Sequence, residues 1–580
     1  MFDPASIATA LAAYYAGRRL AGRWSRPRPP APVYTPPAPS VPATTAYEYP
    51  LFTPVRGANR TTQAGVMRQL SADPGPLFAL AGVLWPAFRY LNKLTLITGR
   101  PEAGKTVMVK MMMASVGRLF GLLQELAEWG RYPGDGMMRW LVVDPTNAYL
   151  PYLYQCLPGD VPITRATPVD LGGKRWDIAR DITSDALNEA LQAGLFPESL
   201  FRKAGDPFWY NKAREITQGI VTVYHDLGSD WQFHDIIVPI KYPQFLKPLL
   251  EQSPRTRGIS QHELVGRLGR DIIATSSSVV NRMAIAAALW QRAEDTFSLR
   301  DFLDRRGVLH FAYTPDQITV LSGVANAMIH VLVLLGISRN DPHNHTILWL
   351  DEGRYLADLA GLEDLAARGR GAGFGAVYAA QGIPGLMNKW GELRVRELLD
   401  ITCTWVAMSA GPETAEAFCR AVGKVEGIQE TFGSSLTHSF TETWGWNSSR
   451  TLSFQSNSTT RGESGSTSRS TSSSSSRSFS LTIKDAILSS ELTNLPLASG
   501  ALDRVCGFAF NPEVGAFQFD APFLHHFEGL PDPPFAAMPT RPDAEQRLYP
   551  WTPDDIRRLN LKPTPELIAA VANTWKEIGG

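Results

Sequence analysis

The sequence has few of the features that mark secreted, metal-binding or disulfide-stabilised proteins. It contains four cysteines and no CxxC pair, which is typical of the reduced thiols of a cytosolic protein. Its ten histidines show no metal-ligand spacing, and His343 and His345, in a loop-like DPHNH, are expected to be solvated. Basic and acidic residues balance at 56 each, so any basic surface must be local.

Apolar segments that would cross a membrane are also scarce. The uncharged part of residues 4–24 is too short to span a bilayer. The arginine cluster that follows it could contact either a membrane surface or a partner subunit. Gln317 to Ser338 has 22 residues without a charge, but its position between two strands favours a buried crossover helix. We therefore expect a cytoplasmic protein without a transmembrane helix, bound at most peripherally at the inner face of the membrane.

A phosphate-binding loop organises the chain. It reads Gly99, Arg100, Pro101, Glu102, Ala103, Gly104, Lys105, Thr106, between an apolar strand-like run and a helical pattern. In this context the glycines let backbone N–H groups surround phosphate oxygens, and the helix N-terminus adds positive potential. Lys105 is expected to reach the β- and γ-phosphates of ATP, and the hydroxyl of Thr106 is expected to hold Mg²⁺.

Two further strand ends carry polar side chains that complete such a site. Asp351 and Glu352 close the apolar run that begins at Thr346, where a second Mg²⁺-site carboxylate and a water-activating acid belong. Gln381 ends the next strand-like run and is expected to contact the γ-phosphate or the attacking water. The alternatives are a solvated turn for the two acids and a plain polar strand cap for Gln381.

Two arginines lie in a glycine-rich stretch shortly before that strand. Arg368 and Arg370 suit a finger that reaches a neighbouring subunit's nucleotide, and we expect Arg370 near the nucleotide edge of the sheet. The alternative is a solvated loop whose arginines pair with surface acids.

Composition divides the chain into eight segments. Prolines mark a linker and a tail, helical patterns mark an insertion, and residues 431–480 contain 28 serines or threonines. The first half of that stretch alternates and is expected to form a hairpin, whereas the second half has too little apolar surface to become ordered. The segments are an N-terminal amphipathic helix (1–26), a proline-rich linker (27–60), the nucleotide-binding core in three parts (61–183, 301–430 and 481–520), an all-α insertion (184–300), the Ser/Thr-rich segment (431–480) and a proline-rich tail with a terminal helix (521–580).

The insertion has a local cluster of basic residues. Four arginines lie within sixteen residues of it, with one acid among them, and they are candidates for contact with DNA phosphates. Ion pairs inside a helical domain are the alternative. These arginines are Arg255, Arg257, Arg267 and Arg270.

The motifs GRPEAGKT, ILWLDE and RGRGAGFGAVYAAQ, in this order, resemble the conjugative coupling ATPases of type IV secretion systems, the TraD/TraG-like proteins. They resemble the FtsK/HerA DNA pumps more distantly. DPFWYNKAREI, TSSSVVNRMAIAA with FSLRDFL, and ILSSELTNLPL are similar to further parts of the coupling-ATPase family. The resemblance covers roughly residues 90–515.

The resemblance implies a hexameric, Mg²⁺-dependent ATPase that brings a relaxase–DNA substrate to a secretion channel. The implied fold class is α/β, with a RecA-like P-loop NTPase core and a mostly parallel sheet. An all-α insertion domain and flexible N-terminal, Ser-rich and C-terminal segments complete it. The family's roles carry over as nucleotide and Mg²⁺ binding (Lys105, Thr106), catalytic acids (Asp351, Glu352), sensor (Gln381) and arginine finger (Arg370).

The sequence departs from the family pattern in two places. Members usually begin with a pair of transmembrane helices, and they commonly have Gly-Glu where Asp144 is followed by Pro-Thr-Asn. Two other functions share the same core. One is a viral or phage DNA-packaging ATPase, and the other is a substrate receptor that ATP binding gates and that pumps nothing.

Overall fold

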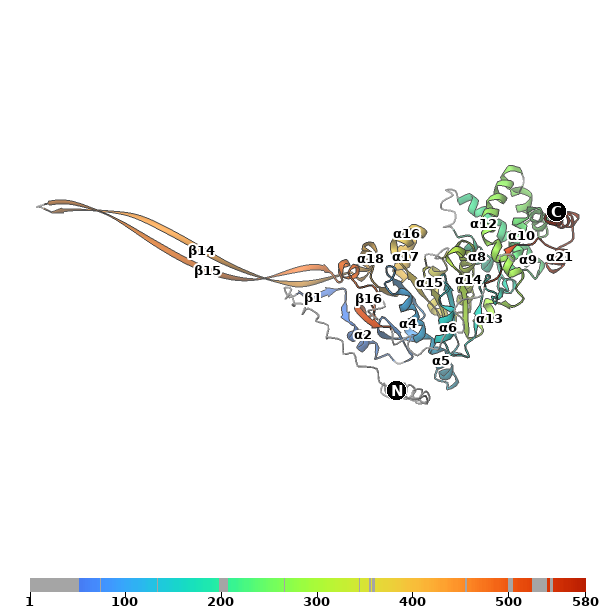
Figure 1. Ribbon diagram of the computed structural model, residues 1–580, viewed down its shortest axis with the longest axis horizontal. Helices are drawn as coiled ribbons and strands as arrows, with labels where there is room; N and C mark the ends of the chain where they lie inside the picture. The colour runs from blue at the N-terminus through green and yellow to red at the C-terminus, as the bar shows by residue number, and fades with distance from the viewer. Residues whose placement is uncertain are drawn as a thin grey trace, which may run out of the picture. The chain divides into compact units, whose positions relative to one another are not determined.

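A computed structural model gives the fold of the chain (Figure 1). It describes residues 52–579 except residues 74, 133, 265 and 344 and segments 198–206, 354–355, 357–359, 454–455, 499–503, 524–539 and 543–545. The expected N-terminal helix and most of the proline-rich linker lie outside the described residues. The chain divides into a ribbon unit (Met1–Ala58 and Gly423–Ala486) and a core unit (Asn59–Val422 and Ile487–Gly580).

A ten-stranded sheet forms the centre of the core unit, in the order β2-β17-β16-β13-β5-β12-β11-β6-β10-β7. The seven strands from β13 to β7 are parallel, and β16 and β17 extend this sheet in antiparallel fashion. The strands are β2 (Arg60–Thr62), β5 (Leu94–Thr98), β6 (Met138–Asp144), β7 (Ile163–Arg165), β10 (Gly307–Ala312), β11 (His345–Leu350), β12 (Phe374–Ala380), β13 (Thr404–Ala407), β16 (Arg504–Asn511) and β17 (Gly515–Pro522).

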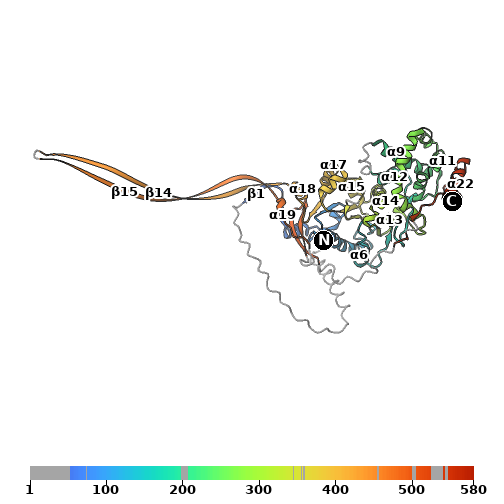
Figure 2. The same cartoon turned by 45° about the horizontal axis from the view of Figure 1, so that its top comes forward.

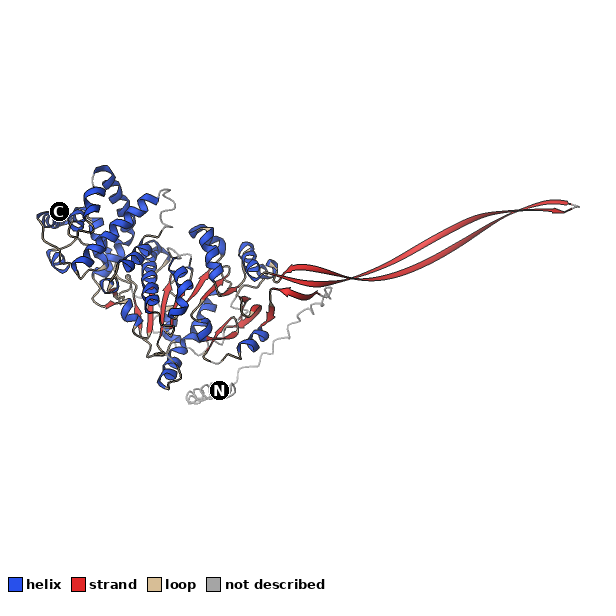
Figure 3. Cartoon of the chain, turned by 180° about the vertical axis from the view of Figure 1, so that it is seen from behind, coloured by secondary structure: helices blue, strands red, loops and turns tan. Residues whose placement is uncertain are grey.

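The parallel strands are buried on both faces. Every residue of β5, β6 and β10 to β13 is buried, as expected where helices cover both sides of a parallel sheet (Figure 3). The helices of this layer are α4 (Lys105–Gly117), α5 (Leu119–Glu128), α6 (Leu150–Cys156), α14 (Ile318–Arg339), α15 (Ala360–Arg368), α16 (Ile383–Trp390), α17 (Glu392–Ile401) and α18 (Pro412–Val422). The predicted α/β class with a mostly parallel sheet is confirmed.

Short elements complete the core unit. The hairpin of β3 (Leu77–Leu80) and β4 (Val83–Pro86) and the pair of β8 (Arg175–Trp176) and β9 (Thr296–Phe297) lie outside the large sheet. The short helices are α2 (Gln63–Leu70), α3 (Ala87–Tyr90), α7 (Ile178–Asp181), α13 (Leu299–Leu303), η5 (Pro315–Gln317), η7 (Gly369–Ala372) and α19 (Ser489–Thr493).

Two helical stretches are long and apolar enough to cross a membrane, judged by length and composition alone. They are Lys105–Glu128 and Ile318–Arg339, and the bent pair Gly266–Ser278 and Val280–Gln291 adds a third if it counts as one span. The most apolar part of Ile318–Arg339 is 78% buried inside the protein, because α14 packs on helix α8 (Asp185–Leu195). A Cβ at Gly194 would lie 2.2 Å from the Ala327 Cα, so glycine allows this close packing. α14 is therefore the buried crossover helix that the sequence predicts between β10 and β11.

The all-α insertion of the predicted fold class is present beside the sheet. Its helices lie together in Figure 1. They are α8, α9 (Pro207–Leu227), α10 (Phe233–Lys241), η3 (Pro243–Phe245), α11 (Leu246–Leu250), η4 (Ile259–Glu263) and α12 (Gly266–Gln291).

The C-terminal segment belongs to this helical domain, which the sequence did not predict. Helix α22 (Pro565–Gly579) packs beside α11 and η3 (Figure 2), and helix α21 (Pro553–Arg558) bonds to α10 through Arg558 and Asp235. Thr564 caps α22 by accepting a hydrogen bond from the Leu567 amide at 3.3 Å. The expected terminal helix is present as α22, but the expectation of a flexible tail is wrong for the described residues after 545, because apolar side chains such as Trp551 and Leu567 are buried.

A buried ion pair joins the C-terminal segment to the insertion. The carboxylate of Asp235 is fully buried and accepts hydrogen bonds from the Arg558 guanidinium at 2.9 and 3.0 Å. It also accepts from the Trp551 indole at 2.9 Å and from the Gln232 amide at 2.7 Å. Burial alone would lower the pKa of Arg558, but Asp235 and Asp555 outweigh it and raise that pKa.

The ribbon unit corrects another expectation. β14 (Lys424–Ser453) and β15 (Ser456–Asp485) form one antiparallel hairpin, visible as a long twisted ribbon in Figure 2. The Ser-rich half, expected to remain unordered, is thus the return strand, and the alternating half pairs with it rather than with itself. Pairing between backbones requires no apolar side chains, so a low apolar content did not exclude a strand. The end of the expected linker is also a strand, because β1 (Phe52–Gly57) pairs with β14 from Val425 to Gln429.

The Asp235–Arg558 pair gives a test of how the C-terminal segment stabilises the helical domain. Arg558→Met leaves the Asp235 carboxylate buried without its main counter-charge, which typically costs about 3–5 kcal/mol. We expect the free energy of unfolding of this domain to fall by that amount in denaturant titrations. Arg557→Met is the matched control: its side chain is 80% exposed and pairs with Asp554 at the surface, so the loss should stay below about 1 kcal/mol. Equal losses in the two variants would contradict the assignment.

Candidate nucleotide-binding site

The phosphate loop connects the buried strand β5 to helix α4. Glu102 and Gly104 have positive φ angles of 63° and 94°. A Cβ at Gly104 would lie 2.6 Å from the Val505 side chain, so only glycine fits this turn. The Arg100 amide donates to the Ser409 carbonyl at 2.7 Å and the Ala498 amide donates to the Glu102 carbonyl at 3.0 Å. The loop is therefore held from two sides in a tight turn before the N-terminus of α4.

Lys105 and Thr106 occupy the first turn of α4. The Lys105 side chain is buried, and its ammonium donates to the Arg100 carbonyl at 3.1 Å, within the loop itself. The Thr106 hydroxyl donates to Asp351 Oδ2 at 3.3 Å. The structure thus brings together the two residues that the sequence predicts as Mg²⁺ ligands, although 245 positions separate them. Hydroxyl and carboxylate oxygens suit Mg²⁺, which takes hard oxygen ligands.

Gln381 and Glu352 meet beside this pair. β12 lies between β5 and β11 in the sheet, so Gln381 follows a strand that separates the phosphate loop from the two acids. Its side-chain amide donates to Glu352 Oε1 at 3.0 Å. Glu352 has a positive φ of 46°, an uncommon conformation for a residue with a side chain, of a kind that often occurs at functional sites.

The sequence did not identify Tyr149, which holds Asp351 from the other side. Its hydroxyl donates to Asp351 Oδ2 at 2.7 Å, and its backbone amide donates to Asp144 Oδ2 at 2.7 Å. Burial raises the pKa of Asp351, and the hydrogen bond from Tyr149 acts in the opposite direction by favouring the charged form. The only sequence signal near Tyr149 was Asp144-Pro145, a dipeptide typical of a turn after an apolar run.

Two charged residues that were not among the predicted site residues, Asp144 and Lys110, lie beside the site. Asp144, at the end of β6, accepts from Thr146 at 2.9 and 3.1 Å and lies 3.4 Å from His310 Nε2. Burial alone would raise the pKa of Asp144, but His310 and these hydrogen bonds outweigh it and lower that pKa. Lys110, on α4, lies over the rings of Tyr149 and Tyr152 at 5.6 and 5.3 Å. Burial lowers the pKa of Lys110, whereas Asp144 and Asp351 oppose that shift.

Arg370 does not lie at this edge of the sheet. Helix η7, which contains it, precedes β12, whereas Gln381 follows β12. The seven-residue strand therefore separates the two by about 23 Å of chain rise. The expectation that Arg370 lies near the nucleotide edge is wrong within one chain, because the glycine-rich stretch enters the strand and does not leave it. Its side chain is exposed.

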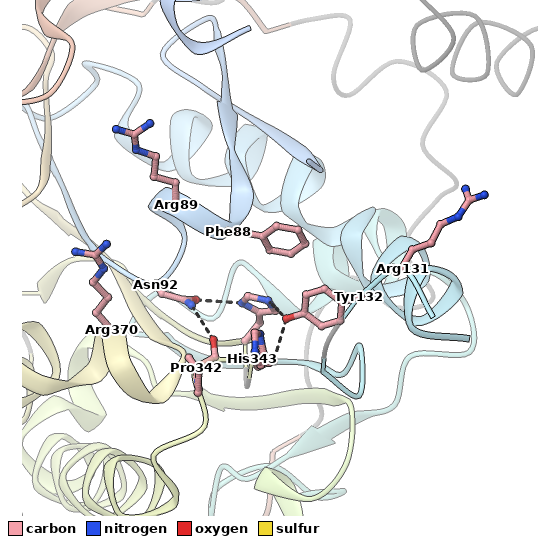
Figure 4. A pocket seen from close by; sticks show the side chains of 9 residues that line it. Phe88, Arg89, Asn92, Arg131, Tyr132, Pro342, His343 and Arg370 are labelled. Carbon is pink, nitrogen blue, oxygen red and sulfur yellow. Dashed lines mark hydrogen bonds between the residues drawn. The ribbon is translucent and has the colours of Figure 1, made fainter. Parts of the chain in front are cut away.

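Arg370 instead lines a pocket of about 340 Å³ at the opposite edge (Figure 4). Arg89 and Arg131 line the same pocket, so three guanidinium groups lie around it. The expectation that His345 is solvated is wrong: it is buried in the wall, with Nδ1 3.1 Å from Asn92 and Nε2 2.5 Å from the Tyr132 hydroxyl. Burial lowers the pKa of His345 to about 4. Among the described residues, no group of three or more histidine, cysteine, aspartate or glutamate side chains is placed to hold a metal ion.

Two of the other predicted arginines make ion pairs. Arg368 pairs with Asp364 on α15 at 2.5 Å, as the solvated-loop alternative predicts. Arg255 pairs with Asp185 at 2.7 Å and Asp226 at 3.1 Å, which favours the structural reading of that residue. Arg257, Arg267 and Arg270 are exposed.

Comparison with known proteins gives a family match and several structural matches. The family of the type IV secretion-system coupling protein DNA-binding domain matches residues 78–512. No curated protein sequence matches the chain. The unbound monoclinic form of the bacterial conjugative coupling protein TrwBdeltaN70 has a TM-score of 0.61 and 16% identity, over 84% of this chain and 97% of that chain.

Two further structures are similar to the same extent. The plasmid coupling protein TrwB in complex with the non-hydrolysable GTP analogue GDPNP has a TM-score of 0.60 and 16% identity, over 84% of this chain and 98% of that chain. TrwB in complex with ADP and Mg²⁺ has a TM-score of 0.58 and 16% identity, over 84% and 97%. At this identity, the likeness concerns the fold.

The contact between Tyr149 and Asp351 predicts a measurable effect on the Mg²⁺ site. Tyr149→Phe removes the hydroxyl that favours the charged carboxylate, and loss of such a supporting hydrogen bond typically weakens metal affinity by about 10–100-fold. We expect the Mg²⁺ concentration needed for half-maximal binding of a fluorescent ATP analogue to rise about tenfold. Tyr152→Phe is the control, because that hydroxyl donates to the Lys110 carbonyl at 2.6 Å. A normal Mg²⁺ requirement in Tyr149→Phe would show that Asp351 does not depend on Tyr149.

Proposed function

The chain belongs to the family of type IV secretion-system coupling proteins, and we propose that it hydrolyses ATP to move DNA towards a secretion channel. The family's description names a DNA-binding domain, which makes DNA the substrate class. The observation that carries the ATPase activity is the meeting of Thr106, Asp351, Glu352 and Gln381 beside one phosphate loop. The similar fold of TrwB has been solved with ADP and Mg²⁺ and with non-hydrolysable analogues of ATP and GTP, which supports a nucleotide at the same loop.

Each residue of the site has a task that its position supports. Backbone amides of the loop and the ammonium of Lys105 bind phosphate oxygens, which requires Lys105 to exchange its contact with the Arg100 carbonyl for the ligand. Thr106 and Asp351 would hold Mg²⁺, which when bound offsets the charge that develops on the phosphates. Glu352 orients the attacking water and accepts its proton. Gln381, bonded to Glu352 at 3.0 Å, positions that carboxylate and senses the γ-phosphate.

We propose that Arg370 of one copy completes the nucleotide site of the next copy. Its position at the edge of the sheet opposite the phosphate loop excludes action on the nucleotide of its own chain, but it suits a finger that projects from one subunit to the next. Such a head-to-tail contact closes into a ring, and the family's hexamer is the ring we propose. Relaxase and channel components are the further partners.

The proposal extends to the residues that contact DNA. Arg257, Arg267 and Arg270 remain the basic candidates of the helical domain once Arg255 is assigned to its ion pairs.

We propose a cytoplasmic location, at the inner face of the membrane. A DNA-packaging motor and a receptor that pumps nothing are the alternatives, and the second predicts slow hydrolysis that DNA does not stimulate.

Hydrolysis with and without DNA tests the proposed activity. We expect the unmodified chain to hydrolyse ATP faster when DNA is added. Glu352→Gln should bind ATP normally yet turn over at least about a hundredfold more slowly, because the amide cannot accept the proton of the attacking water. Lys105→Ala, by contrast, should lose nucleotide binding. Near-normal turnover by Glu352→Gln would remove the catalytic assignment, and a DNA-independent rate would favour the receptor.

A mixing experiment tests whether Arg370 acts between subunits. Arg370→Ala should bind ATP normally but hydrolyse it about 10³–10⁵-fold more slowly, since an arginine finger meets the phosphoryl charge only in the transition state. Mixing it with Lys105→Ala should restore part of the activity, because some interfaces then combine an intact arginine with an intact loop. Arg368→Ala, which loses only its pair with Asp364, is the matched control and should stay active. Mixed oligomers without restored activity would exclude the trans role.

A further inference from the structure

The ribbon of β14 and β15 has two open edges. The strand order of this sheet is β1-β14-β15, and β1 covers β14 only from Val425 to Gln429. Among the described residues, no strand pairs with the outer edge of β14 beyond Gln429 or with the outer edge of β15. An uncovered strand edge presents a row of N–H and C=O groups that can pair with another strand. A two-stranded hairpin is also only marginally stable by itself in water.

The sequence of the ribbon lacks the usual protection against pairing. Natural edge strands are commonly blocked by proline, by bulges or by charged side chains, lysine above all, and of these the ribbon has only a few glutamates and arginines. The whole chain has 43 prolines, yet none lies between Val425 and Ile483, and no lysine lies there either. The register between the two strands is continuous from Lys424–Asp485 to Ser453–Ser456, without a bulge. These edges are therefore suited to accept another strand.

The register assigns the residues of the ribbon to two different faces. Alternate positions of a strand belong to opposite faces, and each residue of β14 is paired with a defined residue of β15. From Gly427 to Thr482, one face contains only serine, threonine, glycine, asparagine and glutamine. The other face holds every charged, aromatic and long aliphatic residue of the two strands in this range. Charges such as Glu442 and Arg469 interrupt that face, so it lacks the continuous apolar band of about 9–11 residues that a lipid-facing strand needs.

Charge on the second face favours another copy of the same ribbon as the partner. Beyond Gln429, where β1 no longer covers the edge, β14 has two glutamates and one arginine, because its third glutamate, Glu426, already pairs with Arg56 of β1. β15, between Ser456 and Ile483, has three arginines and one glutamate. The more acidic strand and the more basic strand occupy the two sides of the ribbon. A second copy therefore presents an acidic strand of matching length to the open basic strand, and its uncharged face adjoins the uncharged face of the first copy.

We propose that β15 of one copy pairs antiparallel with β14 of the next copy, beyond Gln429, where β1 no longer covers the edge. The contact is head to tail, so the two copies at the ends of an open row each keep one open edge until the row closes into a ring. A closed ring of ribbons is a β-barrel with two strands from each copy, and closure removes all open edges. Ring closure rests on the proposed oligomeric motor, whereas the pairing of two ribbons does not.

Cysteine cross-linking of the full-length chain tests this pairing. One variant carries Thr441→Cys on β14, and a second set carries Ser466→Cys, Ser470→Cys or Ser474→Cys on β15, all on the uncharged face. Paired strands bring opposite Cα atoms to about 4.5–5.5 Å, which a disulfide can bridge. Mixtures of the first variant with the second set should form disulfide-linked heterodimers on oxidation, strongest at one of the three positions. Chains with both substitutions should form a ladder of linked copies.

A matched control uses the covered part of the same strand. Gln429→Cys lies on the same face as Thr441→Cys, but β1 occupies the edge there, so it should not link to any β15 position. The unmodified chain, with its own four cysteines, provides the background. No linkage above that background at any of the three β15 positions, or equal linkage of Gln429→Cys, would overturn the pairing. Self-linkage of Thr441→Cys alone would also overturn it, because it would mean that β14 pairs with β14.

The same experiment separates this inference from the proposed function. With Lys105→Ala added, the linked species should remain, because strand pairing needs no nucleotide. Linkage in a chain that keeps Lys105 but hydrolyses no ATP would leave the pairing valid and contradict only the ATPase. Hydrolysis stimulated by DNA without linkage would leave the motor valid and contradict only the pairing.

Discussion

The carboxylate of Asp351 is the point on which the candidate site depends. It receives the Thr106 hydroxyl from the helix after the phosphate loop and the Tyr149 hydroxyl from the segment after β6, at 3.3 and 2.7 Å. Two chain segments that are distant from each other and from Asp351 in sequence thus converge on one buried acid. A buried carboxylate is costly unless it is paired or hydrogen-bonded, so this arrangement fixes the positions of the strand ends relative to one another. Mg²⁺ would find its protein ligands already assembled.

The sequence predicted that these residues lie close together, and the structure places them so, because they obey a simple geometric rule. Parallel strands end at the same edge, so Thr98, Leu350 and Ala380 bring the residues that follow them to one place. The motif of the phosphate loop and the two acids after an apolar strand were therefore sufficient to locate the site. Tyr149 was missed because a tyrosine in a loop after a strand has no distinguishing pattern, and its role appears only when β6 and β11 are seen as neighbours.

The errors of the sequence analysis have physical causes. Arg370 was assigned to the wrong edge because distance along the chain does not distinguish entry into a strand from exit. The C-terminal segment was expected to be a flexible tail because the partner of Arg558 is Asp235, more than 300 positions earlier. The Ser-rich strand was judged by its apolar content, although its order depends on backbone pairing with β14. The first error concerns the direction of the chain through a strand, and the other two concern contacts between segments that are apart in the sequence.

Two separate features of the described residues face away from any matching surface in the same copy. Arg370 lies at the edge of the core sheet that holds no phosphate loop. The ribbon has a more acidic strand and a more basic strand with open edges. Both features are asymmetric, because the surface that each one exposes differs from the surface that it would contact in another copy. A two-fold contact, which joins a surface to itself, would satisfy neither of them, whereas a head-to-tail contact would satisfy both and closes only as a ring. The asymmetry that favours the proposed ring is therefore present in a single copy, in the core unit and in the ribbon alike.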